Sequence, residues 1–385
     1  MTDSTRFAKV LKTPEVIALA FGAMIGWSWV LLTGAWLTAA GTVGTLIAFC
    51  VGGVAVTLIG LTYSELASAM PKAGGEHIYT KRALGSRWSF VCTWALLFSY
   101  VNVCMFEAVA LPSAVEYLYP DIRLGTLWNV LDSDVDLGFI LIGIGATALV
   151  TWVNYLGIRT AAILQAVVTM LIVVTGMLLI SGAIAFGDAS NAQPWIATPV
   201  SGILIVLIMV PSMLIGFDVI PQSAEEIDLP PNKIGRLLIF SVACAVAWYI
   251  LIAMAVGFGL TADALSTTKM ATADAAAALW SGSWAGSLLV LGGIGGILTS
   301  WNAFIVGASR VLFALAESGH VPKVFAKIHP KHKTPYVGIL AIGALTMVAP
   351  LFGRTILVWL VNSGSFAVTV AFVFVAISFL LLRKT

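Results

Sequence analysis

The chain has 385 residues, of which 60% are hydrophobic and only 10% are charged, and its mean hydropathy is +1.01. Soluble domains carry about 25% charged residues, which cover their surface with polar groups. This composition excludes an ordinary soluble enzyme or binding domain, and the net charge of +2 does not indicate a nucleic-acid partner.

Ten apolar segments follow one another along the chain, and most are long enough for the roughly 20 residues that a membrane-spanning helix needs. Lipid offers the backbone no hydrogen-bonding partner, so a spanning segment must be a helix or part of a closed barrel. The segments lack the alternation that is typical of strands, so we predict an all-α membrane protein with ten transmembrane helices. The predicted spans are 15–40, 43–69, 88–119, 138–158, 161–186, 200–222, 235–260, 284–318, 336–352 and 355–382.

The distribution of basic residues predicts how the chain crosses the membrane. Lys and Arg accumulate in cytoplasmic loops. With a cytoplasmic N-terminus, 17 of the 20 Lys and Arg residues lie in inner connections, and only Arg123, Lys269 and Arg354 lie in outer ones. We therefore expect a multi-pass protein of the cell membrane with its N-terminus in the cytoplasm.

Two of the predicted spans are interrupted in a similar way. The first contains Gly22 and Gly26, and the sixth contains Pro211, Gly216 and Pro221. Interruptions at corresponding positions of two halves indicate a transporter site near the middle of the bilayer, because unwound backbone exposes N–H and C=O groups. The alternative is that these glycines only allow helices to pack closely.

Four stretches in chain order resemble the amino acid–polyamine–organocation (APC) transporter superfamily: 22–26, 63–85, 216–226 and 307–331. The resemblance implies a LeuT-like five-plus-five inverted repeat, with helices 1–5 in residues 1–186, helices 6–10 in 187–385, and helices 1 and 6 unwound. Members typically have twelve helices, whereas ten are predicted here. Because the first ten form the transport core, the functional implication is unchanged.

The resemblance implies a secondary active transporter that moves a small amino acid or related solute by alternating access. The proposed partners are this small-molecule substrate, the lipid bilayer and a coupling proton or sodium ion; no cofactor or metal is expected. A transporter of amines, polyamines or ethanolamine and an obligatory amino acid exchanger are the alternatives. The oligomeric state stays open.

Residues at the two interruptions, together with two polar residues of the third span, are predicted to bind the substrate. Glu107 is an acid at membrane depth, where a charged side chain faces a cavity or a partner; its alternative is an acid near the outer interface that reaches water. Asp218 either contacts substrate or caps freed N–H groups, and Trp27 could bind a cation over its ring. The predicted substrate-binding residues are Ala23, Met24, Ile25, Gly26, Trp27, Ser28, Asn102, Glu107, Ile215, Gly216, Phe217 and Asp218.

Ion coupling is predicted to involve Glu107, Thr299 and Ser300. In sodium-coupled relatives of the fold, two adjacent hydroxyls of helix 8 bind Na⁺, and oxygen ligands suit a hard cation. The alternative is that these hydroxyls bind carbonyls of their own helix. Several proton-linked relatives have a lysine at the position of Ile163, so that lysine is not available here.

The remaining charged residues lie mainly in the predicted inner loops. We expect ion pairs there between the acids Glu65, Glu76, Glu225 and Glu226 and the bases Lys72, Lys81, Arg82 and Arg310. All four histidines also fall in these loops, which leaves no catalytic histidine at membrane depth. The sequence therefore predicts a transporter and not an enzyme, and no filter loop of the kind that a channel needs is visible.

Overall fold

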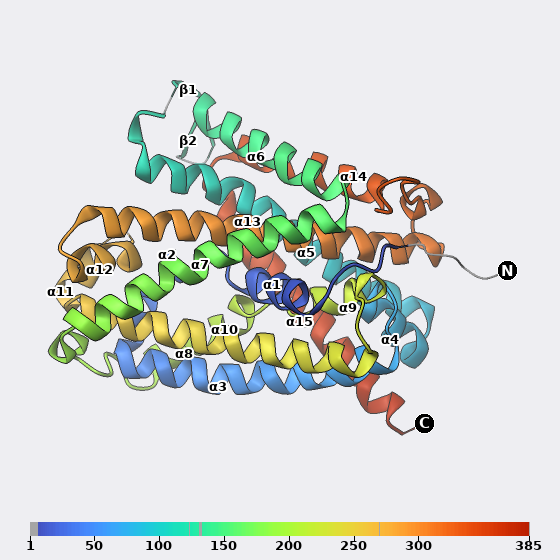
Figure 1. Ribbon diagram of the computed structural model, residues 1–385, viewed down its shortest axis with the longest axis horizontal. Coiled ribbons are helices and arrows are strands. Elements are labelled where there is room, and N and C mark those ends of the chain that lie inside the picture. Colours follow the sequence, from blue (N-terminus) through green and yellow to red (C-terminus); the bar gives the residue numbers. More distant parts are fainter. Residues whose placement is uncertain (1–6, 123, 131–132, 269, 385) are drawn as a thin grey trace.

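The computed structural model describes residues 7–122, 124–130, 133–268 and 270–384 (Figure 1). This part of the chain is almost entirely helical. In the first half the elements are α1 (Thr13–Met24), α2 (Ser28–Leu31), α3 (Thr33–Ala69), α4 (Gly75–Leu84), α5 (Ser86–Leu118), η1 (Pro120–Ile122), β1 (Thr126–Val130), β2 (Ser133–Asp136), α6 (Leu137–Tyr155) and α7 (Ile158–Phe186). In the second half they are η2 (Ala189–Ala192), α8 (Ser201–Met213), α9 (Val219–Gln222), η3 (Ala224–Glu226), α10 (Pro231–Gly259), α11 (Ala262–Thr267), α12 (Ala271–Leu279), α13 (Ser283–Glu317), η4 (Lys323–Ala326), α14 (Tyr336–Thr346), η5 (Ala349–Phe352) and α15 (Ile356–Leu382).

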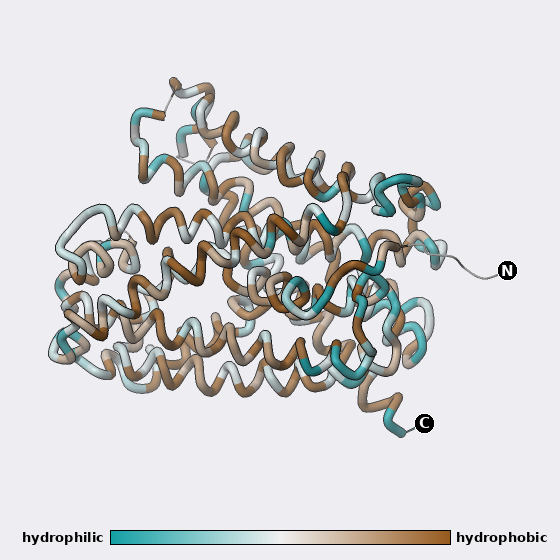
Figure 2. Tube along the Cα trace, viewed as in Figure 1, coloured by the Kyte–Doolittle hydropathy of each residue, from teal (hydrophilic) through white to brown (hydrophobic). Residues whose placement is uncertain are grey.

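Among the described residues, seven helices are long and apolar enough to cross a membrane: α3, α5, α6, α7, α10, α13 and α15. Three shorter apolar helical segments are α1, α8 and the stretch 336–352. Hydrophobic residues fill the bodies of the helices, and hydrophilic residues gather in the connections at their ends (Figure 2). The chain is therefore a multi-pass membrane protein.

The structure joins the first two predicted spans differently from the sequence-based boundaries. The predicted span 15–40 is distributed over α1, α2 and the beginning of α3, and α3 then continues to Ala69. The two parts of α3 meet at Gly41, whose φ of 74° and ψ of 173° are not helical. A Cβ atom at Gly41 would lie 2.7 Å from the carbonyl oxygens of Pro194 and Trp195, so only glycine fits where the connection between α7 and α8 covers the bend.

Several elements were not predicted because they are short and lie in connections. The helix α4 lies in the connection between α3 and α5, and α11 and α12 lie between α10 and α13. The strands β1 and β2 form an antiparallel hairpin in which Trp128 pairs with Val135 and Val130 with Ser133. Hydropathy over a window of membrane-span length does not register such elements.

The helices lie roughly side by side, so the connections collect at two opposite ends of the molecule (Figure 1). Both termini and α4 lie at one end, whereas α11, α12 and the hairpin lie at the other. The helix α13 runs through the centre and contacts α1, α5, α7 and α12. Around it, α3 packs against α8 and α10, and α15 packs against α5.

Candidate functional site

The first helix is interrupted between Met24 and Ser28. The helix α1 ends at Met24, and α2 begins at Ser28. Within the described part of the chain, the amide N–H groups of Gly26 and Trp27, which fall between the two helices, have no hydrogen-bonding partner. Free N–H groups of this kind are suited to an anion such as a carboxylate.

Glycines of α13 allow the centre of the molecule to approach this interruption closely. A Cβ atom at Gly296 would lie 2.5 Å from the carbonyl oxygen of Gly26, and one at Gly293 would lie 2.3 Å from the ring of Trp27. The indole of Trp27 is 4% exposed and packs against α13. The indole of Trp27 therefore packs in the core, and its contact with substrate stays a prediction.

The sixth predicted span is interrupted between α8 and α9, and this interruption contacts the end of α1. Gly216 has a φ of 125°, a conformation that residues with a side chain rarely adopt. A Cβ atom at Gly216 would lie 2.6 Å from Cβ of Ala23 and 3.1 Å from the amide nitrogen of Met24. The second interruption therefore lies against the end of α1, directly before the first interruption, and both Ala23 and Ile215 are buried there.

A tyrosine of α10 connects the two interruptions. The hydroxyl of Tyr249 donates to the carbonyl oxygen of Met24 at 2.9 Å. The hydroxyl of Ser28 lies 2.8 Å from the Tyr249 hydroxyl. The carbonyl oxygen of Met213, at the end of α8, lies 3.4 Å from the same Tyr249 hydroxyl. One phenol thus satisfies backbone and side-chain groups that the interruptions leave open. Tyr249 was not predicted, because a tyrosine in an apolar span cannot be distinguished by sequence from a packing residue.

Glu107 of α5 lies beside the first interruption. Its side chain is 2% exposed, so it does not reach water at an interface. The hydroxyl of Ser300 donates to Oε1 of Glu107, while Oε2 has no partner among the described residues. A Cβ atom at Gly26 would lie 3.2 Å from Oε1 of Glu107. The structure thus brings together Gly26, Glu107 and Ser300 from three different helices.

Asp218 is fully buried, and both of its oxygens are occupied. Oδ1 accepts a hydrogen bond from the amide of Gly216 at 2.9 Å, and Oδ2 accepts one from the hydroxyl of Tyr100 at 2.6 Å. These bonds fit the structural alternative, in which Asp218 holds the interrupted backbone. Its neighbour Phe217 is also buried and forms an aromatic layer with Tyr63, at 5.3 Å, and Phe372, at 5.6 Å between ring centroids.

Two further predicted positions, Asn102 and Thr299, use their polar atoms elsewhere, and Ile163 lies away from this cluster. Asn102 donates to the carbonyl of Phe98, and its Oδ1 accepts a hydrogen bond from Ser363 of α15. The hydroxyl of Thr299 bonds carbonyls of its own helix, at 3.1 Å, as the alternative interpretation expected. Ile163 is 58% exposed, so a lysine at that position would not face the interruptions, and its absence says nothing about coupling.

A chain of buried amide side chains links α6, α13, α7 and α1. Asn154 donates to Asn302 at 2.9 Å, Asn302 donates to Gln165 at 2.7 Å, and Gln165 donates to the carbonyl of Ala18 at 3.2 Å. Gln165 was not predicted, although a polar side chain within an apolar span was the available signal. These hydrogen bonds hold α1 against α6, α7 and α13.

The end of the molecule that carries both termini is closed by a buried ion pair. Arg310 of α13 binds both carboxylate oxygens of Glu226, at 2.7 and 2.9 Å, and both side chains are 1% exposed. The N-terminal segment lies over this pair, because Val10 and Leu11 donate to the carbonyl of Glu226 and the ring of Phe7 lies 5.9 Å from the Arg310 guanidinium.

The other predicted ion pairs of this end are corrected by the structure. Glu65 pairs with Arg383 at 3.1 Å, Glu225 accepts from the amide of Ala73, and Glu76 accepts from the side chain of Gln222. None of these partners is a base from the predicted set. The order of acids and bases along a loop does not determine which of them meet.

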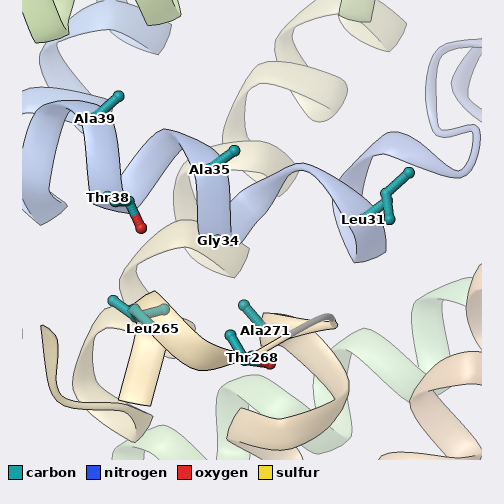
Figure 3. A pocket seen from close by; sticks show the side chains of 8 residues that line it. All are labelled: Leu31, Gly34, Ala35, Thr38, Ala39, Leu265, Thr268 and Ala271. Atoms are coloured by element: carbon teal, nitrogen blue, oxygen red, sulfur yellow. The ribbon is translucent and has the colours of Figure 1, made fainter. Parts of the chain in front are cut away.

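A pocket of about 420 Å³ lies at the opposite end, between the beginning of α3 and the helices α11 and α12 (Figure 3). Its walls are mainly apolar, with the hydroxyls of Thr38 and Thr268 as the polar side-chain groups. The lining residues are Leu31, Gly34, Ala35, Thr38, Ala39, Leu265, Thr268 and Ala271. None of the predicted site residues is among them.

Comparisons with known proteins identify the family of the chain. The family model described as "Amino acid permease" matches residues 11–385. The chain is 27% identical over 380 residues to the branched-chain amino acid permease BcaP of Bacillus subtilis, covering 96% of this chain and 80% of the relative. It is 28% identical to human cationic amino acid transporter 4 but covers only 61% of that protein's length. It is 25% identical to the methylthioribose transporter of Bacillus subtilis, of which it covers 83%.

Proposed function

Because this chain belongs to the amino acid permease family of the APC superfamily, we propose that it moves a small neutral amino acid across the cell membrane by alternating access. The two interrupted helices form the substrate site. The observation that carries this proposal is the meeting of free backbone N–H groups, at Gly26 and Trp27, with an unpaired oxygen of the buried Glu107.

The proposed architecture is the five-plus-five inverted repeat with ten spans. In it, residues 1–186 supply the first five helices and 187–385 the second five. The interruptions at residues 25–27 and 214–218 then occupy corresponding places in the two repeats, and their contact at Ala23 and Gly216 supports this correspondence. The excess of Lys and Arg at the end with both termini supports a cytoplasmic N-terminus.

The charges of the site match the two ends of an amino acid. The carboxylate of the substrate accepts hydrogen bonds from the N–H groups of Gly26 and Trp27, where the end of a helix favours negative charge. Its ammonium group donates to Oε2 of Glu107. A simple amine lacks the carboxylate and leaves the backbone N–H groups unsatisfied, which disfavours the amine alternative.

The available acids favour a neutral side chain over a cationic one. The relatives bear names that refer to branched-chain amino acids, cationic amino acids and methylthioribose. Here Asp218 is occupied by Tyr100 and Gly216, so the free oxygen of Glu107 is the one carboxylate oxygen at the interruptions that remains for a ligand among the described residues. The ammonium group of the substrate donates to this Glu107 oxygen, so no carboxylate remains there for a cationic side chain.

Uptake into proteoliposomes tests the proposal. The full chain is reconstituted, and labelled leucine and arginine are supplied with an imposed proton gradient, an imposed sodium gradient, or the unlabelled amino acid inside. We expect leucine to enter faster than arginine and to be displaced by other small neutral amino acids. Equal or faster uptake of arginine contradicts the proposed selectivity, and the absence of uptake of either contradicts the proposed function. The three conditions separate proton coupling, sodium coupling and obligatory exchange.

A further inference from the structure

The inner loop helix α4 carries a second buried acid, which the substrate site does not use. Glu76 lies in the second position of α4 and is 0% exposed. Its Oε2 accepts a hydrogen bond from the side-chain amide of Gln222, whereas its Oε1 has no partner among the described residues. The contact with Gln222 joins α4 to α9, the short helix that follows the second interruption.

Other polar atoms around this contact are also left without partners. The hydroxyls of Tyr63 on α3 and Tyr79 on α4, the Oε1 atom of Gln222 and the hydroxyl of Ser223 are buried and unpaired within the described part of the chain. A buried polar group without a partner costs free energy of folding. These four atoms and Oε1 of Glu76 therefore require an explanation. The cluster contains hydrogen-bond donors, which are the hydroxyls, and an acceptor, which is the amide oxygen of Gln222.

The charge of Glu76 is not compensated by a nearby base. Among the described residues, neither Glu76 nor Asp218 forms an ion pair, and Arg310 is bound to Glu226. Burial raises the pKa of Glu76 well above its ordinary value, and the charge of Asp218 raises it further. The other titratable groups that interact with Glu76 are Tyr79 on its own helix and Cys92 and Tyr100 on α5.

We propose that Glu76 binds one proton when the inner end is closed and that the inner end opens only with release of this proton to the inner water. The inference rests on the proposed alternating-access cycle and adds a control that the substrate site does not contain. In the closed state the protonated carboxyl donates a hydrogen bond. With the Gln222 amide turned about its own axis, Gln222 Oε1 accepts that bond from Oε2 of Glu76, so the orphaned oxygen atom of Gln222 gains a partner.

Opening of the inner end requires α9 to separate from α4. A Cβ atom at Gly75 would lie 3.0 Å from Pro221 and 3.3 Å from Nε2 of Gln222, so α4 and α9 are in direct contact. Separation exposes Glu76 to water, and in water the carboxyl loses its proton at neutral pH. The proton goes from Oε of Glu76 to inner water and returns on closure, so an alkaline interior favours opening and an acidic interior favours closure.

A proton fits this place better than a metal ion. The described residues contain no group of three or more His, Cys, Asp or Glu side chains that could hold a metal. The side-chain groups that lie around Glu76 include the hydroxyls of Tyr63 and Tyr79 and the amide of Gln222, which can donate hydrogen bonds, whereas a metal ion needs several oxygen acceptors directed at one point.

The test compares Glu76→Gln with Glu65→Gln in proteoliposomes. Glutamine imitates a carboxyl that never releases its proton. Glu65 is a matched control, because it is also an inner acid but lies half-exposed beside Arg383. Exchange of labelled leucine is measured at equal pH on both sides. If opening limits the rate, wild type and Glu65→Gln slow by up to about tenfold for each pH unit of acidification, since one proton is released per opening. In Glu76→Gln this slope is lost while exchange continues.

A second readout does not depend on transport. In infrared spectra of purified protein at neutral pH, the difference between wild type and Glu76→Gln should contain the carbonyl band of one protonated carboxyl, which the difference between wild type and Glu65→Gln lacks. An ionised carboxylate band in its place overturns the proposal, as does an unchanged pH slope in Glu76→Gln. If wild type transports neither leucine nor arginine, the proposed function fails, and the infrared band still decides the protonation of Glu76.

Discussion

At the scale of single residues, two buried acids near the interruptions have different surroundings. Asp218 accepts hydrogen bonds from Gly216 and Tyr100 on its two oxygens. Glu107 accepts one from Ser300 and keeps its second oxygen free among the described residues. A group whose hydrogen bonds are all made within the protein holds structure, whereas a free buried oxygen is available to a ligand. We therefore assign ligand binding to Glu107 and the support of the backbone to Asp218.

Glu107→Gln tests the first assignment. The substitution removes the charge but keeps the size of the side chain, and a hydrogen bond to a charged group contributes about 1.5–3 kcal/mol. We expect the KM for leucine uptake to rise by about tenfold to a hundredfold. The control Asn102→Ala removes a side chain that bonds α15 and should change KM by less than about threefold. Uptake by Glu107→Gln at the wild-type KM would remove Glu107 from the site.

Tyr249→Phe tests whether one hydroxyl holds the two interruptions together. Without it, the carbonyl of Met24 loses its donor, and a buried group left unsatisfied destabilises a protein by about 1–3 kcal/mol. We expect a lower midpoint of thermal unfolding in detergent and slower leucine uptake. The control is Tyr119→Phe, which removes a hydroxyl from a residue that is 67% exposed. Equal midpoints for the two variants would contradict the role given to Tyr249.

At the scale of elements, the interruption of the sixth span depends on a residue without a side chain. Gly216→Ala would force alanine to adopt a φ of 125° and would place its Cβ 2.6 Å from Cβ of Ala23. Strain and overpacking together should destabilise the fold by about 2–5 kcal/mol.

The matched control is Gly145→Ala in α6, where an added Cβ meets nothing within 4 Å. Because alanine is the better helix former, this variant should be neutral or stabilised by up to about 1 kcal/mol. Thermal unfolding of the two variants in the same detergent measures the difference. A Gly216→Ala variant as stable as Gly145→Ala would show that the chain at this point is an ordinary helix.

The sequence predicted the positions of both interruptions but not what surrounds them. The glycines and prolines around Gly26 and Gly216 predict the interruptions, because these residue types affect the backbone locally. No local sequence signal identifies Tyr249 and Gln165, because their roles depend on carbonyl groups of α1 that are distant in sequence. Glu76 was predicted in an ion pair, yet it meets Gln222, because loop sequences do not specify which helix covers a given acid. Short helices such as α11 were not predicted, because they contain no long apolar run.

At the scale of the whole molecule, the two ends differ. The end with both termini is closed by the Arg310–Glu226 pair, the aromatic layer around Phe217 and the N-terminal segment. The opposite end contains the pocket between α3 and α11. This asymmetry is what one state of an alternating-access transporter requires, because the site must open to one side at a time. In this account the structure represents a state closed toward the cytoplasm.

The most direct test is an experimental structure of the full chain in a lipid nanodisc with a saturating concentration of leucine. We expect density for the amino acid between the two interruptions, with its carboxylate within hydrogen-bonding distance of the Gly26 and Trp27 amides and its ammonium group at Glu107. Leucine bound in the pocket between Leu31 and Ala271 alone, or a continuous helix through residues 13–31, would contradict it.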